Sequence, residues 1–176
     1  ADRWIMSQVE HTAQTVADAM ANYRFDLVSQ TLHEFIWNEY CDWYVELSKP
    51  ILWDEDANPE AAQTTRRVLL VVLEKSLRML HPFMPFITEE IWQKVAPMLD
   101  IEGDSIMLAP YPQFDASQVD EQAEEHIHWL RGIIVAIRTI RSEMDISPGK
   151  EIPVLLRHGD ADDQTRLKAY RLYLQK

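Results

Sequence analysis

Histidine and acidic side chains that could hold a metal ion occur at two places in the sequence. His33 and Glu34 open the pattern HExxH, in which two histidines one helical turn apart bind zinc and the glutamate acts as a base. The fifth position is Trp37, so the second ligand is absent and the pattern fails. His126 and His128 would lie about 200° apart on a helix, which prevents them from holding one ion together. The sequence therefore predicts no metal site.

The residues that could act as nucleophiles, general acids or phosphate ligands are no better placed. Cys41 is the single cysteine and stands among aromatic residues, which favours an inert, buried thiol over a nucleophile. The acid pairs Glu89-Glu90 and Glu124-Glu125 point in different directions and are typical of a solvated surface. Four glycines in the whole chain could hardly form a phosphate-binding loop. We expect no catalytic residue and no bound cofactor in this chain.

Basic side chains form ridges on two predicted helices. The ridge residues are Arg66, Arg67, Lys75 and Arg78 on one helix, and Arg131, Arg138 and Arg141 on the other. Such ridges either keep a surface solvated or contact the phosphates of a nucleic acid. The net charge of −12 argues against a nucleic acid wrapped widely around the protein. A small local contact is still compatible with it, because the acids cluster in the linkers 54–60, 100–104 and 160–163.

Aromatic side chains are the second kind that could bind another molecule. Trp4, Trp43 and Tyr44 lie near predicted helix ends, where they either belong to the core or offer flat faces to unpaired nucleotide bases. Arg3 precedes Trp4 and would place a cation beside a ring at the tip of the first helix. The region is therefore a candidate for binding single-stranded RNA.

The elements that carry these residues are predicted to be helices, because apolar residues recur at spacings of three and four. One helix opens at Pro85, and the others cover residues 2–23, 27–48, 61–80 and 117–144. The first should bury one stripe that runs from Ile5 to Tyr23. The second is apolar on several faces, with Trp37 and Cys41 widening its stripe, and should lie centrally. The third should expose a ridge that holds Arg67, Lys75 and Arg78.

Prolines are expected to end these helices. Pro50 should stop the second, His81-Pro82 the third, and Pro148-Gly149 the last of the bundle. The inner face of the helix that opens at Pro85 should include Ile87, Ile91, Trp92 and Val95. The connection 97–118 is long enough to predict a packed loop with a role.

The character of the sequence changes after Gly149. Residues 152–156 are predicted to form a strand, and residues 164–175 another amphipathic helix. The expected architecture is all-α: a bundle of about five helices over residues 1–149, followed over residues 150–176 by the truncated start of a small α/β element.

Length and composition are typical of one globular domain with a small appendage: 176 residues, 47% apolar and 26% charged. One cysteine excludes an internal disulfide and fits a reducing compartment. No apolar run approaches the ~20 residues that a membrane span needs, and a signal peptide's basic and apolar regions are absent. We therefore expect a soluble cytoplasmic protein.

Five segments together resemble a known family. They are DRWI (2–5), RFD (24–26), FIWNEYCDWYVELSKP (35–50), HPFMPFITEEIWQKV (81–95) and IRSEMDISPGK (140–150). They resemble the helical anticodon-binding domain of the valyl-tRNA synthetases, class I aminoacyl-tRNA synthetases of the valine, isoleucine, leucine and methionine subgroup. The isoleucyl and leucyl members share a looser form of the HPFMPFITEEIW block. The resemblance covers essentially the whole chain.

This resemblance implies recognition of the anticodon stem-loop of valine tRNA (tRNA-Val). The parent enzymes attach valine to that tRNA with ATP and Mg²⁺, and they edit misattached threonine. The HIGH and KMSKS signatures of that chemistry do not occur here. We therefore expect a fragment that is inactive alone and that is joined to catalytic and coiled-coil domains in the parent chain.

The resemblance also implies site residues. The methionine relatives place an arginine near the start of the first helix and a tryptophan late in the second against the anticodon, and these resemble Arg3 and Trp43 by position. The supporting candidates on the same helices are Trp4, Asn38, Glu39, Asp42 and Lys49. The competing hypothesis is a helical scaffold that docks another protein or domain without RNA contact, and the acidic charge favours it.

Overall fold

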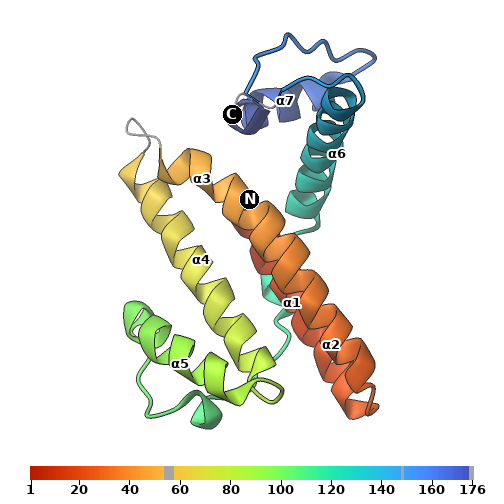
Figure 1. Ribbon diagram of the computed structural model, residues 1–176. Helices are drawn as coiled ribbons and strands as arrows, with labels where there is room; N and C mark the ends of the chain where they lie inside the picture. Colours follow the sequence, from red (N-terminus) through yellow and green to blue (C-terminus); the bar gives the residue numbers. More distant parts are fainter. Residues whose placement is uncertain (54–57, 148, 175–176) are drawn as a thin grey trace. The chain divides into compact units, whose positions relative to one another are not determined.

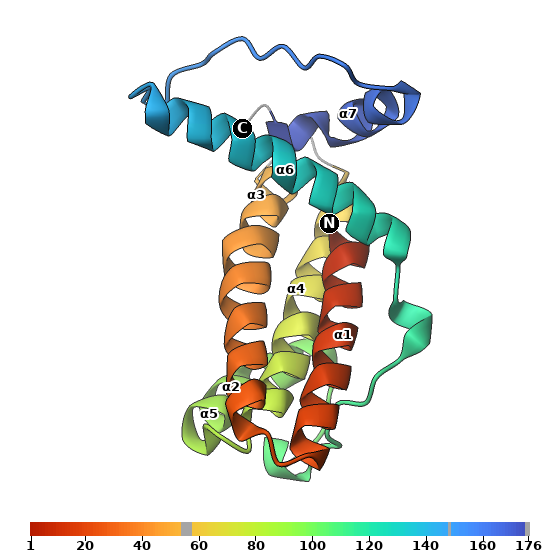
Figure 2. The ribbon, with the colours of Figure 1, turned by 90° about the vertical axis from the view of Figure 1, so that its right-hand side faces the viewer.

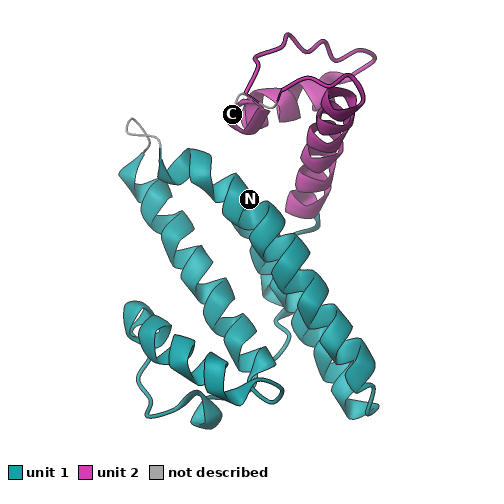
Figure 3. Cartoon of the chain, viewed as in Figure 1, with its two compact units in different colours: residues 1–121 teal, residues 122–176 magenta. Residues whose placement is uncertain are grey.

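The computed structural model describes residues 1–53, 58–147 and 149–174, and their regular elements are all helical (Figure 1). The all-α class predicted from the sequence is confirmed. The chain forms two compact units, residues 1–121 and 122–176, each described by itself (Figure 3). The predicted domain boundary at residue 149 stays a prediction; the compact units divide after Glu121. Part of the acidic linker (54–57), Pro148 and Gln175 lie outside the described residues.

The first unit opens with two long antiparallel helical rods (Figure 2). Helix α1 spans Asp2–Ala21; the second rod runs without a break through α2 (Phe25–Glu34), the π-helix η1 (Phe35–Val45) and α3 (Glu46–Leu52). The turn between the rods is tight because Tyr23 has a left-handed backbone with φ 56°. Arg24 donates two hydrogen bonds to Asp26 there, and these hold the pKa of that exposed carboxyl down to about 2.

The second rod differs from the regular α-helix that the sequence predicted. Its middle eleven residues are a π-helix, in which each hydrogen bond spans five residues instead of four. The expectation that Pro50 stops the helix was also wrong, since the helix continues to Leu52. Pro50 lies in the last turn of α3, where the loss of one backbone donor removes a single hydrogen bond and the chain ends the helix two residues later.

The next two helices are α4 (Pro59–Leu80) and α5 (Pro85–Val95). The predicted end of α4 at His81-Pro82 and the predicted start of α5 at Pro85 are confirmed, while α4 begins two residues before the predicted start at residue 61. Pro59 and Pro85 each occupy the first turn, where a missing N–H costs nothing. The Asn58 side chain caps α4 by accepting a hydrogen bond from the backbone N–H of Glu60 at 3.0 Å. α4 packs beside α1 and lies along both rods (Figure 2).

Apolar side chains between α1, the second rod and α4 form the main core. The fully buried apolar residues of these helices include Ile5, Val9, Val16, Val28, Leu32, Tyr44, Val72 and Met79. The predicted stripe of α1 is therefore confirmed as far as Val16. Tyr23 at its end was wrongly placed inside, because the helix stops at Ala21 and the ring is exposed in the turn.

A second, smaller core lies between α4, α5 and the connection that follows. Leu77, Trp92, Ala96 and Ile106 are its buried members. The connection includes short 3₁₀ segments η2 (Ala96–Leu99), η3 (Ile106–Leu108) and η4 (Ala116–Gln118). Glu89 of α5 accepts hydrogen bonds from the Ser105 hydroxyl at 2.8 Å and the Ile106 N–H at 3.2 Å. The packing expected of this long connection is confirmed.

The turn between α4 and α5 leaves apolar side chains in solvent. Phe83, Met84, Phe86 and Ile87 are exposed, and the Phe86 side chain is 90% exposed. Ile87 was predicted to face inward, but Trp92 and Val95 fill the inner face of α5 without it. This α4–α5 apolar patch, residues 83–87, is thus unpartnered by the described residues of its own unit.

The second unit consists of α6 (Glu121–Glu143), an extended segment and α7 (Ala161–Leu174). α6 ends at Glu143, where a left-handed Asp145 (φ 51°) lets the Ile146 N–H bond the Arg141 carbonyl at 2.8 Å. The strand predicted over residues 152–156 does not form. This segment is extended, and a strand requires a hydrogen-bonded neighbour, which none of the described residues supplies.

Side-chain contacts join α6 to α7 within this unit. Arg166 forms an ion pair with Glu125. The Tyr170 ring meets the His126 ring edge-on, with centroids 5.9 Å apart. His126 is therefore a packing residue rather than part of a solvated helix start. Across the residues that the structure describes, no helix is both long and apolar enough to cross a membrane.

Candidate nucleic-acid interface

The Asp2 carboxylate ties three helices together at one end of the first unit. It accepts hydrogen bonds from the Tyr44 hydroxyl of η1 and the Thr65 hydroxyl of α4, each at 2.9 Å. The start of α1, the end of η1 and the first half of α4 are therefore neighbours. We call this region, which carries Arg3 and Trp43, the Asp2 end of the bundle.

Arg3 and Trp4 have opposite surroundings although they are adjacent in the sequence. The Arg3 side chain is 71% exposed and pairs with Asp120 at 3.0 Å. Trp4 is only 3% exposed, and Tyr44 is fully buried. Their burial favours the core interpretation of these two rings over the stacking one. Arg3 keeps its place as the accessible cation of the Asp2 end.

The π-helix decides which side chains of η1 face solvent. The nine steps from Phe35 to Tyr44 make about two full turns at roughly 4.4 residues per turn in a π-helix, but two and a half turns at about 3.6 in an α-helix. Both rings are buried, so the π geometry puts them on one inward face. An α-helix would have turned one of them outward.

The same geometry gathers four exposed side chains opposite that inward face. Trp37, Asn38, Cys41 and Asp42 are all exposed. Counted from Phe35, they fall within about a third of a turn at the π-helical spacing. We call these four residues the η1 face. It brings together the predicted site residues Asn38 and Asp42 with an indole ring that was expected to be buried.

The remaining candidates of the second rod lie beside this face or beyond it. Glu39 and Trp43 are half-buried. Lys49 pairs with Glu46 and places its ammonium 5.5 Å from the centre of the Trp53 ring, a cation–π contact. Lys49 is therefore engaged within α3 and is held near the Asp2 end.

Cys41 is exposed, which corrects the prediction of a buried thiol. The π-helical winding places the Cys41 side chain on the solvent-facing side of η1. In an α-helix with the same sequence, this side chain would point in another direction. Partial desolvation, together with the neighbouring Asp42 carboxylate, raises the pKa of the Cys41 thiol. A nucleophile needs the thiolate form, which the raised pKa disfavours. Cys41 is therefore still expected to be unreactive, but because of this raised pKa and not because its side chain is buried.

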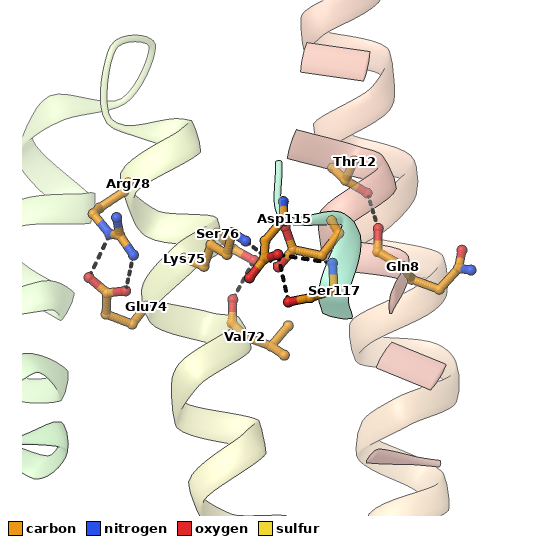
Figure 4. Close-up of polar contacts among 10 residues, drawn as sticks. Gln8, Thr12, Val72, Glu74, Lys75, Ser76, Arg78, Asp115 and Ser117 are labelled. Atoms are coloured by element: carbon orange, nitrogen blue, oxygen red, sulfur yellow. Dashed lines mark hydrogen bonds and ion pairs between the residues drawn. The ribbon is translucent and has the colours of Figure 1, made fainter. Parts of the chain in front are cut away.

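The basic ridge predicted on α4 is only partly on the surface. Arg66 and Arg67 are exposed. Lys75 forms an ion pair with the buried Glu10 of α1, and Arg78 forms two hydrogen bonds with the buried Glu74 at 2.7 and 2.8 Å (Figure 4). The interpretation of Lys75 and Arg78 as an exposed ridge was wrong, because buried carboxylates draw both cations inward.

Among the described residues, no three histidine, cysteine or acidic side chains come close enough to hold a metal ion. The Asp2 end and the η1 face offer an exposed ring, amide and carboxylate groups, and an arginine. These groups suit unpaired nucleotide bases, which are bound by stacking and by hydrogen bonds to their edges.

Comparison with known proteins decides the family. A model of the anticodon-binding domain of tRNA ligases matches residues 2–156. The chain belongs to this family. The matched residues include Arg3 of the Asp2 end and all four residues of the η1 face. The resemblance inferred from the five sequence segments is confirmed.

Curated relatives narrow the comparison within the family. A protein of Coxiella burnetii named valine–tRNA ligase is 50% identical over 175 residues, which are 99% of this chain and 19% of the relative. A protein of Acinetobacter baylyi with the same name is 49% identical over 167 residues, 95% of this chain and 17% of the relative. The chain thus spans about a fifth of the length of the curated relatives that it matches.

Trp37 is the exposed ring of the η1 face, and the sequence did not indicate it as a candidate. α-Helical spacing had assigned its ring to the core, and the aromatic run around it offered no contrary signal. The signal that could have found it is the pair of large rings at Phe35 and Tyr44, nine residues apart, which cannot both be buried at about 3.6 residues per turn.

Proposed function

We propose that this chain is the anticodon-binding domain of a valine–tRNA ligase and that it binds the anticodon loop of tRNA-Val. The observation that carries the proposal is the family match over residues 2–156, together with two relatives of that name at about half identity. The exposed Arg3 at the Asp2 end and the η1 face supply the cation, ring and hydrogen-bonding groups that splayed bases need.

Within this proposal the η1 face and the Asp2 end bind different parts of the RNA. Asn38 and Asp42, with Glu39 and Trp43 beside them, bind base edges, while Arg3 and Lys49 contact phosphates from the start of α1 and from α3. Arg3 is 71% exposed, so a phosphate can replace its partner Asp120 at little cost. Trp4 supports this end from within the core.

The ligase activity itself would belong to the part of the protein outside these 176 residues. ATP and Mg²⁺ would be bound there. The two relatives named valine–tRNA ligase are about five to six times as long as the part that this chain matches. We accordingly propose valine attachment as the activity of the longer protein, and the cytoplasm as its compartment.

Anticodon-dependent binding tests the proposal. The chain should bind a synthetic anticodon stem–loop of tRNA-Val and should bind one with a substituted anticodon more weakly, as measured by fluorescence anisotropy of labelled RNA. Arg3→Ala should lower the affinity. Arg24→Ala is the matched control, because Arg24 is an exposed arginine at the opposite end of α1. Equal affinity for both stem–loops would overturn the proposal.

A protein-docking role is favoured by the net charge of −12 and by the α4–α5 apolar patch with its 90% exposed Phe86. The dependence of the affinity on salt concentration distinguishes protein docking from RNA binding. Docking through an apolar patch is insensitive to moderate salt, whereas RNA affinity falls as salt rises.

A further inference from the structure

We infer that the η1 face holds one unstacked nucleobase that carries an exocyclic amine, with the base stacked on Trp37. This inference rests on the proposed function and deepens it. It assigns a stacking role to a residue that neither the family match nor the sequence had singled out, and it names the kind of base that the face accepts.

The Trp37 ring is both exposed and held in place. Its side chain is 60% exposed. The His33 ring from the preceding turn lies nearly parallel to it, at an interplanar angle of 8° with centroids 6.3 Å apart. An indole supported in this way loses little conformational freedom when a base stacks on it, so more of the stacking free energy appears as affinity.

The hydrogen-bonding groups beside the ring select the ligand. Asn38 and Asp42 are exposed on the same face as Trp37, and within the described residues neither side chain is engaged in a hydrogen bond. A carboxylate only accepts hydrogen bonds. Adenine, cytosine and guanine each present an exocyclic amine as donor, while uracil carries carbonyl oxygens and no amine. The Asn38 amide can accept from the same base and also donate to a neighbouring ring nitrogen.

The charge of the face determines which part of the RNA it meets. Asp42 would repel a phosphate, so the backbone must lie away from the η1 face and a base edge must point toward it. The cation Arg3 belongs to the Asp2 end, outside this face. Recognition on the η1 face is therefore recognition of a base, and the affinity that it adds should depend on base identity.

The test uses the 176-residue chain and the tRNA-Val anticodon stem–loop. Trp37→Ala should weaken binding about fivefold or more, the effect of losing one stacked base. Phe86→Ala is the control, since it removes a more exposed ring from another part of the unit and should leave affinity unchanged. Circular dichroism of each variant checks folding. Trp37→Phe keeps a smaller stacking surface, so its affinity for the stem–loop should lie between those of Trp37→Ala and the parent chain.

Base analogues test the selection. Each adenosine of the anticodon is replaced in turn by purine riboside, each guanosine by inosine, and each cytidine by its analogue without the amine. At one position, loss of the amine should weaken binding by the parent chain but not by Asp42→Ala, which has no side-chain acceptor there.

The outcomes separate the two proposals. Anticodon-dependent binding that is unaffected by Trp37→Ala, or an equal response of the parent chain and Asp42→Ala to every analogue, overturns the inference and leaves the proposed function standing. Binding without anticodon dependence overturns the proposed function. An α4–α5 patch that binds RNA instead would appear as a loss of affinity in Phe86→Ala.

Discussion

Glu74 shows how a single buried carboxylate connects elements that are distant in the sequence. It is 4% exposed and accepts hydrogen bonds from Arg78 and from the Trp92 indole N–H, the latter at 3.0 Å. Arg78 in turn donates to the Pro110 carbonyl at 2.8 Å. The network thus links α4, α5 and the long connection. Arg78 was predicted to be a surface cation, because a pattern of charges along one helix does not show which carboxylate will be buried against other elements.

Removal of this carboxylate should be costly. We expect Glu74→Ala to lower the free energy of unfolding by about 3–5 kcal/mol, since it leaves a largely buried guanidinium and a buried indole N–H without their acceptor. Urea denaturation measures the change. Gln63→Ala, on an exposed position of the same helix, is the control and should change stability by less than about 0.5 kcal/mol. Similar values for both variants would contradict the role of the network.

Tyr40 should give the chain a stability that is lost at high pH. Burial raises the pKa of its phenol to about 12, and its hydroxyl donates to the Leu69 carbonyl at 3.0 Å. A pKa raised by folding stabilises the native state below the unfolded value of about 10, and this contribution disappears as pH rises toward the folded value.

The free energy of unfolding should therefore fall between about pH 10 and 12. Ultraviolet titration of phenolate, taken as the difference between the chain and Tyr40→Phe, reports the pKa directly. Tyr40→Phe should cost about 0.5–1.5 kcal/mol at neutral pH, where the hydrogen bond is intact. A phenolate difference spectrum centred at pH 10 would show that the group is solvated.

At the scale of elements, local signals predicted some boundaries and missed others, and periodicity predicted the interiors less well. α5 begins at Pro85 and α4 ends at Leu80, directly before His81-Pro82, as expected, because these signals act within one turn of backbone. Pro50 did not stop the second rod, and α4 begins at Pro59, two residues before the predicted start. Residues 35–45 were misjudged for the opposite reason. A π-helix is stabilised by tertiary packing of Phe35 and Tyr44, and no local propensity predicts it.

The start of α4 allows a local test. Asn58→Ala removes the side-chain acceptor of the Glu60 N–H and should destabilise the chain by about 1 kcal/mol. Asn58→Asp keeps an acceptor and adds a favourable charge at the helix N-terminus, so it should match or exceed the parent stability. Thermal denaturation followed by circular dichroism compares the three proteins. A loss in Asn58→Asp equal to that in Asn58→Ala would rule out capping as the cause.

At the scale of the whole molecule, the sequence predicted the all-α class and the family, because both depend on many residues at once. The candidate site was predicted in part: Asn38 and Asp42 share one face, whereas Trp4 is buried and Trp37 was overlooked. The strand at residues 152–156 failed for a physical reason. Alternating polar and apolar residues with β-branched side chains favour one extended segment, but a sheet needs a second strand that pairs with it.

The net charge of −12 leads to a prediction for the whole chain. Few phosphates can be neutralised when the accessible cations are scattered, so the tRNA affinity should fall with salt along a shallow line. The slope of log affinity against log salt should be about −0.7 for each single-strand phosphate contacted. Arg3→Ala should make the slope shallower by about that amount. A slope unchanged by Arg3→Ala would place the phosphate contact elsewhere.

The eleven-residue π-helix has a consequence for protein engineering. Within residues 35–45, the number of residues matters more than their identity. Deleting a single position would let the segment relax into the commoner helical winding, and every side chain before the deletion would rotate relative to those after it. One of the two inward rings would then meet water. Insertions and deletions of single residues should therefore be far more damaging here than in α4. Mutant libraries of this segment should vary the amino-acid types while keeping the number of residues fixed.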